Sequence, residues 1–489
     1  MTDRVPLTAE IGRLLDRARP LTVSPETETA AAWIEARLSE PIRVAIAGRV
    51  KAGKSTLLNA LVGERLAPTD AGECTKIVTW YRYGLTYGVV AVFTGGARLP
   101  VPFTRERDQL VLNVGGLDVE RIERLEVTWP SERLRRLTLV DTPGLAGHDE
   151  ASALRTSRVL GLDAGRSEVD AVIYLMRHAH RLDAQFLDAF SDRSLASPSP
   201  VNAVAVLSRA DEIGAGRPDA IDSATAVAER YRADPRIRQL CASVVPVAGL
   251  IAETGRTLLE SEGRALRTIA ALPAGEREHM STSVDRFTEP DRSPVDVGVR
   301  RDLLLRLGMF GVRLGLDVMG RADATSGDLA RALVDASHID GLADVVEEQF
   351  GRRSELLKAR SALINLKALV AALPDSADVN ELRQEVERLE SGAPELAELR
   401  LLHLVISGVA GFTDEQSAEV DRLVAHVSPA SSLGLADDSP HEQMLATIIA
   451  RVDEWRREAA FALASAEHRE ACELMVGEYE RLYADVVSR

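Results

Sequence analysis

The chain has 489 residues, more than a single hydrophobic core usually holds, so two or three domains are expected. Aromatic residues make up only 4% of the composition, and the abundance of Ala, Leu, Arg and Glu indicates a helix-rich protein. The 59 Lys and Arg against 75 Asp and Glu give a net charge of −16. This argues against a general nucleic-acid binder, because neutralising phosphates requires a basic surplus.

The first half of the chain predicts an α/β domain preceded by helices. Residues 7–19 and 26–39 have the helical spacing of apolar positions, and residues 42–48 (IRVAIAG) are typical of a buried strand. Further strands are expected at 77–84, 88–96, 124–130, 137–144, 170–176, 202–208 and 243–249. Helical stretches between several of these strands predict a mostly parallel sheet with helices on both faces.

The second half of the chain, from about residue 255, shows helical periodicity and no further strand pattern. Residues 281–299 and 427–441 are rich in Ser, Pro and Asp and are expected to be connectors, while residues 440–488 predict a long helical segment. An extended all-α bundle is therefore expected to follow the α/β domain.

Three cysteines, Cys74, Cys241 and Cys472, lie far apart without metal-ligand spacing, which supports neither a disulfide framework nor a zinc site. A reducing cytoplasm fits best. The N-terminus lacks an apolar signal core, and no run approaches the roughly 18 apolar residues that span a bilayer. We expect a soluble protein with at most peripheral membrane contact.

Residues Gly48–Ser55 (GRVKAGKS) fit the phosphate-binding pattern G-x-x-x-x-G-K-[ST] and lie between a predicted strand and a predicted helix. Backbone N–H groups of such a loop, with the positive end of the following helix, can surround a phosphate chain. Lys54 would reach the β- and γ-phosphates, and the Ser55 hydroxyl would ligate Mg²⁺. The loop therefore predicts a P-loop nucleotide site.

Two further segments predict the magnesium and γ-phosphate contacts. Asp141-Thr142-Pro143-Gly144 follows an apolar strand, so Asp141 would hold Mg²⁺ through water and the Gly144 N–H would contact the γ-phosphate. Thr75 lies 20 residues beyond Ser55 and just before the strand that starts at Ile77. We prefer it to the other nearby threonines as the residue that closes over Mg²⁺ and the attacking water.

Ser208-Arg209-Ala210-Asp211 occupies the place where GTPases read guanine. Asp211 can accept two hydrogen bonds, from the guanine N1–H and the exocyclic amine, which adenine cannot offer. Arg209 would lay its aliphatic stem against the base, a position usually held by lysine. The nucleotide contacts expected from these elements and from the last strand are Val50, Lys51, Ala52, Gly53, Lys54, Ser55, Thr56, Ser208, Arg209, Asp211, Val247 and Ala248.

A family resemblance extends these motifs. Residues 48–61, 73–79, 141–144 and 208–214, together with SVDRF at 283–287 and LLLRLGMFGVRLG at 303–315, resemble a bacterial dynamin-like protein. The likeness is strongest to the actinobacterial isoniazid-inducible family, in particular its shorter C-type members. It implies neck helices at 1–41, a GTPase domain at 42–255, a helical stalk at 256–439 and a C-terminal helix at 440–489 that returns to the neck.

The resemblance also implies a function. GTP binding would pair two GTPase domains, of this chain or of this chain and a partner dynamin-like protein, and hydrolysis would drive tethering, fusion or scission of membranes. The protein would be cytoplasmic and would contact anionic lipids at the inner face of the plasma membrane. No hydrophobic paddle is evident; the apolar stretches 401–412 and 303–315 are candidates for lipid contact, although buried helix core explains both.

Lys51 is a candidate for a second catalytic cation. Related large GTPases place either a small polar residue or an arginine finger at this loop position, and charge developing in the transition state needs a cation besides Lys54 and Mg²⁺. A lysine that points to solvent is the alternative.

Two other functions remain open at this point. One is a regulatory or assembly GTPase that acts on a protein or RNA, for which the acidic balance disfavours RNA. The other is a scaffold with a vestigial site, which the presence of Lys54, Ser55, Asp141 and Asp211 disfavours.

Overall fold

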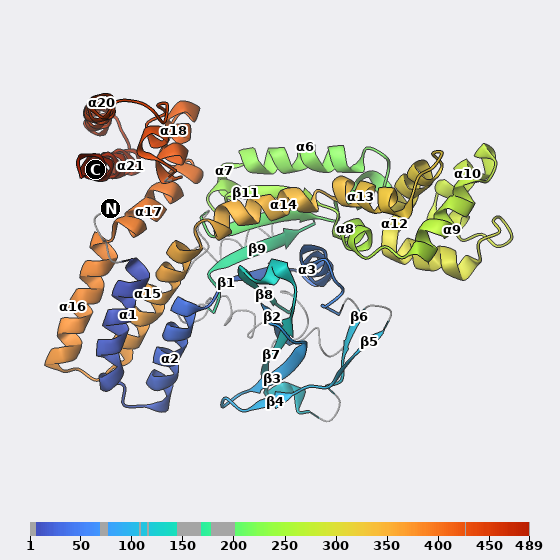
Figure 1. Ribbon diagram of the computed structural model, residues 1–489, viewed down its shortest axis with the longest axis horizontal. Helices are drawn as coiled ribbons and strands as arrows, with labels where there is room; N and C mark the ends of the chain where they lie inside the picture. The colour runs from blue at the N-terminus through green and yellow to red at the C-terminus, as the bar shows by residue number, and fades with distance from the viewer. Residues whose placement is uncertain are drawn as a thin grey trace.

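The computed structural model describes residues 6–68, 77–106, 109–114, 117–143, 168–177, 201–425 and 427–488. A nine-stranded sheet lies at its centre, in the order β11-β10-β9-β1-β8-β2-β7-β3-β4 (Figure 1). The strands are β1 (Ile42–Gly48), β2 (Val78–Tyr83), β3 (Gly88–Phe93), β4 (Arg98–Pro100), β7 (Ile122–Trp129), β8 (Leu137–Asp141), β9 (Ala171–Met176), β10 (Ala203–Ser208) and β11 (Ser243–Val247), with β5 (Phe103–Glu106) and β6 (Gln109–Leu112) forming a separate hairpin.

The sheet is mostly parallel, as predicted. β1 pairs in parallel with β8 and β9, and the parallel pairing continues through β10 to β11. The antiparallel pairs are β2 with β8, and β3 with both β4 and β7. All seven residues of β1 are buried, which explains why the strand is apolar apart from Arg43.

The helices cover both faces of the sheet, which confirms the predicted fold class. α3 and α14 pack on the face that carries Val44 and Ile46, and α6 packs on the face that carries Ala45 and Ala47. The α-helices described between β1 and residue 346 are α3 (Lys54–Val62), α6 (Ala220–Ala233), α7 (Pro235–Arg238), α8 (Gly249–Arg256), α9 (Glu260–Ala270), α10 (Ala274–Ser281), α11 (Val284–Phe287), α12 (Val297–Met319), α13 (Ser326–Ser337) and α14 (Ile339–Val346).

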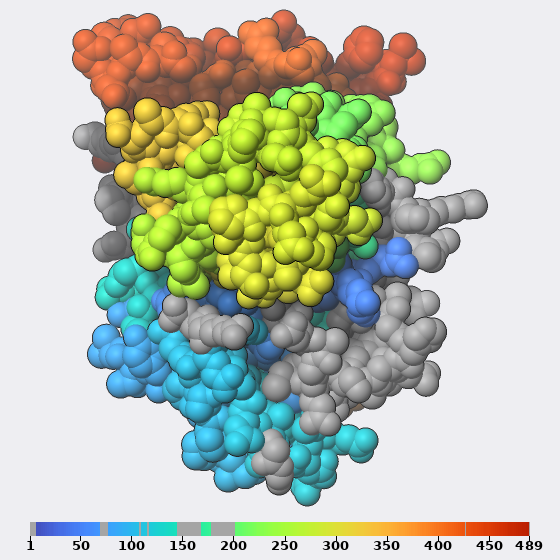
Figure 2. Space-filling view, turned by 90° about the vertical axis from the view of Figure 1, so that its right-hand side faces the viewer, coloured from blue at the N-terminus to red at the C-terminus, as the bar shows by residue number. Residues whose placement is uncertain are grey.

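Residues 257–337, which contain α9 to α13, form a helical lobe at one end of the sheet (Figure 1). Leu266, Phe310 and Leu333 of this lobe share one buried cluster with Ala205 of β10. The packing is therefore continuous across residue 255, where the sequence placed the start of the stalk. When the molecule is viewed from that end, the lobe stands at the front, toward the viewer (Figure 2).

The other helices gather at the opposite end of the sheet (Figure 1). α1 (Leu7–Ala18) and α2 (Pro25–Ser39) pack against α15 (Ser354–Ala372), and α1 also contacts α16 (Ala377–Gly392). Beyond them lie α17 (Pro394–Ile406), α18 (Asp414–Val424), α19 (Pro429–Ser432), α20 (His441–Ala459) and α21 (Ala466–Val487). The C-terminal segment is thus two helices, which pack on each other, and α21 also packs on α17. The assignment of these helices to a neck and a stalk stays a prediction.

Both apolar stretches considered for lipid contact lie mainly in the interior. Leu401, Leu402 and Leu404 of α17 are buried, as are Leu307 and Phe310 of α12. Among the described helices, none is long and apolar enough to cross a bilayer.

Candidate functional site

The phosphate-binding loop has the geometry that its sequence predicts. Gly48 ends β1 with φ of 149°, and a Cβ at this position would lie 2.7 Å from the Leu175 carbonyl oxygen, so the close approach of β9 requires glycine. Gly53 is left-handed and α3 begins at Lys54. The Lys54 Nζ donates to the carbonyls of Gly48 and Arg49, each at 3.3 Å, and therefore lies within the loop. Burial lowers the Lys54 pKa.

Ser55 and Asp141 meet beside this loop. The Ser55 hydroxyl donates to Asp141 Oδ2 at 3.0 Å, and Asp141 is positioned because β8 pairs with β1 at Ile46. The Thr142 hydroxyl donates to the Ile46 carbonyl at 2.9 Å and fixes the residue after the strand. Burial raises the Asp141 pKa, against the opposing effect of Lys54.

These two side chains fit a magnesium ion. Asp141 Oδ1 is buried without a hydrogen-bond partner, and together with the Ser55 hydroxyl it offers the hard oxygen ligands that Mg²⁺ prefers. In the described part of the chain, no cluster of three or more His, Cys, Asp or Glu could hold a metal by itself. A magnesium ion held here would therefore take its remaining ligands from water and phosphate, as is usual for this ion.

A cavity of about 130 Å³ lies next to the loop and contains the expected guanine-reading residues. Its lining comprises Ala52, Gly53, Thr56, Leu57, Leu175, Val206, Ser208, Arg209, Asp211, Glu212, Val247, Gly249 and Leu250. Asp211 is only 6% exposed, and burial raises its pKa to about 6. The cavity thus combines apolar walls with the buried Asp211 carboxylate, while the second carboxylate of the lining, Glu212, is paired with Arg209. This is a suitable setting for a flat base with two donors.

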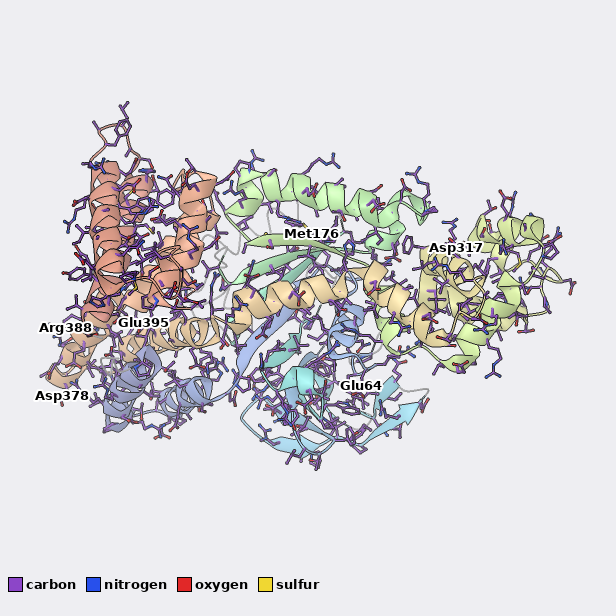
Figure 3. All side chains as sticks on the ribbon, turned by 45° about the horizontal axis from the view of Figure 1, so that its top comes forward. Glu64, Met176, Asp317, Asp378, Arg388 and Glu395 are labelled. Atoms are coloured by element: carbon purple, nitrogen blue, oxygen red, sulfur yellow. The ribbon has the colours of Figure 1, made fainter. Side chains whose placement is uncertain are left out.

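Arg209 joins this cavity to the phosphate-binding loop. Its guanidinium donates to the Lys51 carbonyl at 2.9 Å and to Glu212 at 2.7 Å. Its backbone is left-handed, with φ of 56°, an uncommon conformation for a residue with a side chain. The Ser208 hydroxyl donates at 3.2 Å to the carbonyl of Met176, the residue labelled at the end of β9 in Figure 3. The base and phosphate elements therefore share one edge of the sheet.

Not every predicted residue lies in this arrangement. Val247 lines the cavity, whereas Ala248 is buried and donates its N–H to the Ser337 carbonyl at 3.0 Å. Lys51 and Val50 are exposed at the tip of the loop. The predictions for Thr75 and Gly144 lie outside the described residues.

Other residues at the cavity were not predicted. Gly249 and Leu250 directly follow the predicted contacts at the end of β11, so their position in the chain was the available signal. Gly308 of α12 lies beside Asp211: a Cβ at this glycine would be 3.6 Å from Asp211 Oδ2. Nothing in the apolar helical pattern of α12 indicated this neighbour.

Comparisons with known proteins show the family of the chain. The dynamin family pattern matches residues 44–194. Over 459 residues the chain is 39% identical to Isoniazid-induced protein IniC of Mycobacterium tuberculosis, covering 93% of this chain and 92% of that protein. The chain belongs to the IniC-like bacterial dynamin-like proteins. As a member of this family it is a GTPase with a dynamin-type GTPase domain.

Two more distant matches were also found. A bacterial dynamin-like protein of Nostoc punctiforme is 27% identical over 147 residues, which cover 28% of this chain and 20% of that protein. A solved structure of an oligomerised bacterial dynamin pair is 13% identical with a TM-score of 0.36, covering 99% of this chain and 76% of that one.

Proposed function

We propose that this IniC-like protein hydrolyses GTP to GDP and phosphate with Mg²⁺, and that it couples hydrolysis to GTPase-domain pairing and membrane remodelling at the inner face of the cytoplasmic membrane. The observation that carries the nucleotide part is the cavity with Asp211, which the Arg209 to Lys51 hydrogen bond ties to the phosphate-binding loop. The membrane part rests on membership of the family.

Each residue at the site has a role in this proposal. The Asp211 carboxylate would accept from guanine, and Lys54 would neutralise the β- and γ-phosphates. Ser55 and Asp141 would hold Mg²⁺, which supplies positive charge against the phosphate oxygens. Lys54 and the Oδ1 atom of Asp141 are buried, so water screens these interactions weakly.

Pairing of GTPase domains is supported by the exposed tip of the phosphate-binding loop. Arg49, Val50 and Lys51 are exposed, and the Val50 side chain is 50% accessible. These residues stand at the nucleotide edge, where two domains that face each other would meet. In the paired state Lys51 could turn toward the phosphates and serve as the second cation.

A different segment supports membrane contact. The turn between α20 and α21 exposes Phe461 (59%) and Leu463 (86%), within the uncharged run 459–466. α20 and α21 lie at the edge of the molecule away from the lobe (Figure 1). Two apolar side chains on one uncharged turn suit the shallow insertion of a peripheral protein into a bilayer.

Liposome co-sedimentation of the full chain tests this proposal, with and without a non-hydrolysable GTP analogue. Vesicles of phosphatidylcholine alone and with phosphatidylglycerol separate apolar insertion from attraction to anionic lipids. We expect wild type to pellet and Phe461→Ser/Leu463→Ser to stay in solution. Ile449→Ser is the matched control, because Ile449 is 52% exposed on α20 but lies within the helix.

The outcomes separate the alternatives. Pelleting of wild type that the double substitution leaves unchanged would place the lipid contact elsewhere. No pelleting in any nucleotide state would favour a regulatory GTPase that acts on a protein partner.

A further inference from the structure

The helical lobe reaches the guanine cavity through an interruption in α12. Gly308 has φ of 61° and ψ of −179°, a combination that essentially only glycine adopts, in the middle of an otherwise helical segment. A Cβ here would lie 3.6 Å from Asp211 Oδ2 and 3.8 Å from Leu250, which also lines the cavity. The interruption therefore lies against the base-reading carboxylate.

The loop that carries Asp211 also needs support from outside. Arg209, Gly214, Ala215 and Gly216 are all left-handed, and two of them carry side chains that disfavour this conformation. Such strained backbone persists only where its surroundings hold it in place.

Arg313 of α12 provides this support. Its guanidinium donates to the carbonyl of Gly216 and, at 3.4 Å, to that of Ala215. The same group donates to Ser281 at 2.8 Å and to Thr282 at 3.1 Å, the carbonyls at the end of α10. One side chain thus connects the loop at 209–216, called the guanine loop below, to two helices of the lobe.

Close packing next to Arg313 strengthens the connection. A Cβ at Gly216 would lie 3.3 Å from the Phe310 backbone nitrogen, so α12 and the guanine loop touch through their backbones. α12 lies in the lobe that Asp317 marks in Figure 3, while Asp211 follows β10 at the sheet edge.

We propose that α12 is part of the guanine-recognition site: Gly308 and Arg313 are positioning residues that hold the Asp211 carboxylate in place, so the lobe sets how strongly guanine is selected. This inference rests on the proposed reading of guanine by Asp211. It assigns a nucleotide-related role to a segment that the sequence placed in the stalk.

Nucleotide titration of the full chain tests this role, with fluorescent GDP, IDP and ADP as probes. IDP lacks the exocyclic amine and can make only one of the two bonds to Asp211, and ADP makes neither. We expect Gly308→Ala and Arg313→Gln to lower GDP affinity by about tenfold or more, to lower IDP affinity less, and to leave ADP affinity unchanged.

One control lies in the lobe, and the other lies in α14, the helix that follows it. Arg331→Ala removes an exposed lobe arginine that pairs only with its neighbour Asp328 among the interactions recorded for the described residues, and Gly341→Ala adds a methyl group where nothing lies within 4 Å. Both should keep the wild-type ratio of GDP to IDP affinity.

The ratio of affinities separates positioning from folding. A general weakening of the fold would lower the thermal midpoint and reduce all three affinities together, and that result would overturn the inference. Arg313→Gln keeps the proposal testable if Gly308→Ala does not fold. If Asp211→Asn itself leaves the preference for GDP over ADP intact, the guanine assignment fails as well; if only the α12 variants behave like wild type, the inference alone fails.

Discussion

The buried Asp211 carboxylate should cost stability whenever no nucleotide is bound. Burial raises its pKa from the ordinary 3.8 to about 6, and at about 1.4 kcal/mol per pKa unit this corresponds to about 3 kcal/mol. The folded protein binds the proton more tightly than the unfolded chain does. Ionisation therefore disfavours folding, increasingly between pH 4 and 6 and fully above pH 6.

Asp211→Asn keeps the shape of the side chain and removes the charge. We expect the variant without nucleotide to be more stable than wild type by up to about 3 kcal/mol at pH 7.5, and by about half of that at pH 5. Saturating GDP should reverse the order, because the Asn amide places a donor opposite the guanine donors and binding energy is lost.

Thermal unfolding of both proteins at pH 7.5 and 5, with and without GDP, compares the eight conditions. A gain of a few kcal/mol would shift the midpoint of a unit of this size by several degrees, at about 2–4 °C per kcal/mol. A variant that is no more stable than wild type, or a difference that does not change with pH, would refute the burial argument.

Three further outcomes are expected at the same site. Lys54→Ala or Ser55→Ala should abolish turnover while leaving the thermal midpoint near that of wild type, because both side chains face the ligand; normal GTPase activity would contradict the assignment. Lys51→Ala should lower kcat by roughly tenfold to a thousandfold with GTP affinity nearly unchanged, and wild-type activity should rise more than linearly with protein concentration. Relative to Asp211→Asn, in which only the phosphates and other groups titrate, the affinity of wild type for GTP should fall by about a further tenfold per pH unit below pH 6 as Asp211 becomes protonated, measured by equilibrium titration of both proteins.

The nucleotide site was largely predictable because its chemistry depends on short, local patterns. A buried parallel strand requires a continuous apolar run, and the ends of β1, β8 and β10 meet at one edge of the sheet. The motifs that follow these strands therefore come together without further information. β4 escaped prediction because its three residues are all exposed, so no apolar alternation marks the strand.

The organisation of the helices was less predictable because amphipathicity shows that a helix buries one face but not which partner covers it. The spacing of apolar residues in α12 is as compatible with a helix of a stalk as with a helix of a lobe that packs on the GTPase domain. The break between α20 and α21 contains neither glycine nor proline, and its one local signal was Ser465, whose hydroxyl caps α21 at the His468 N–H.

The two ends of the nucleotide site are attached to different groups of helices. On the phosphate side the connection runs through β1. α2 ends two residues before this strand begins, at the strand end opposite the phosphate-binding loop, and Arg37 of α2 forms a fully buried ion pair with Asp170. Asp170 also accepts from the Arg43 backbone N–H of β1 at 2.8 Å, and breaking such a buried pair costs about 3–5 kcal/mol. α2 therefore moves with the strand that ends in the phosphate-binding loop, whereas the guanine loop is held by α12. If one nucleotide spans both ends, as proposed, its binding would restrict the movement of α2 and its neighbours relative to the helices of the lobe.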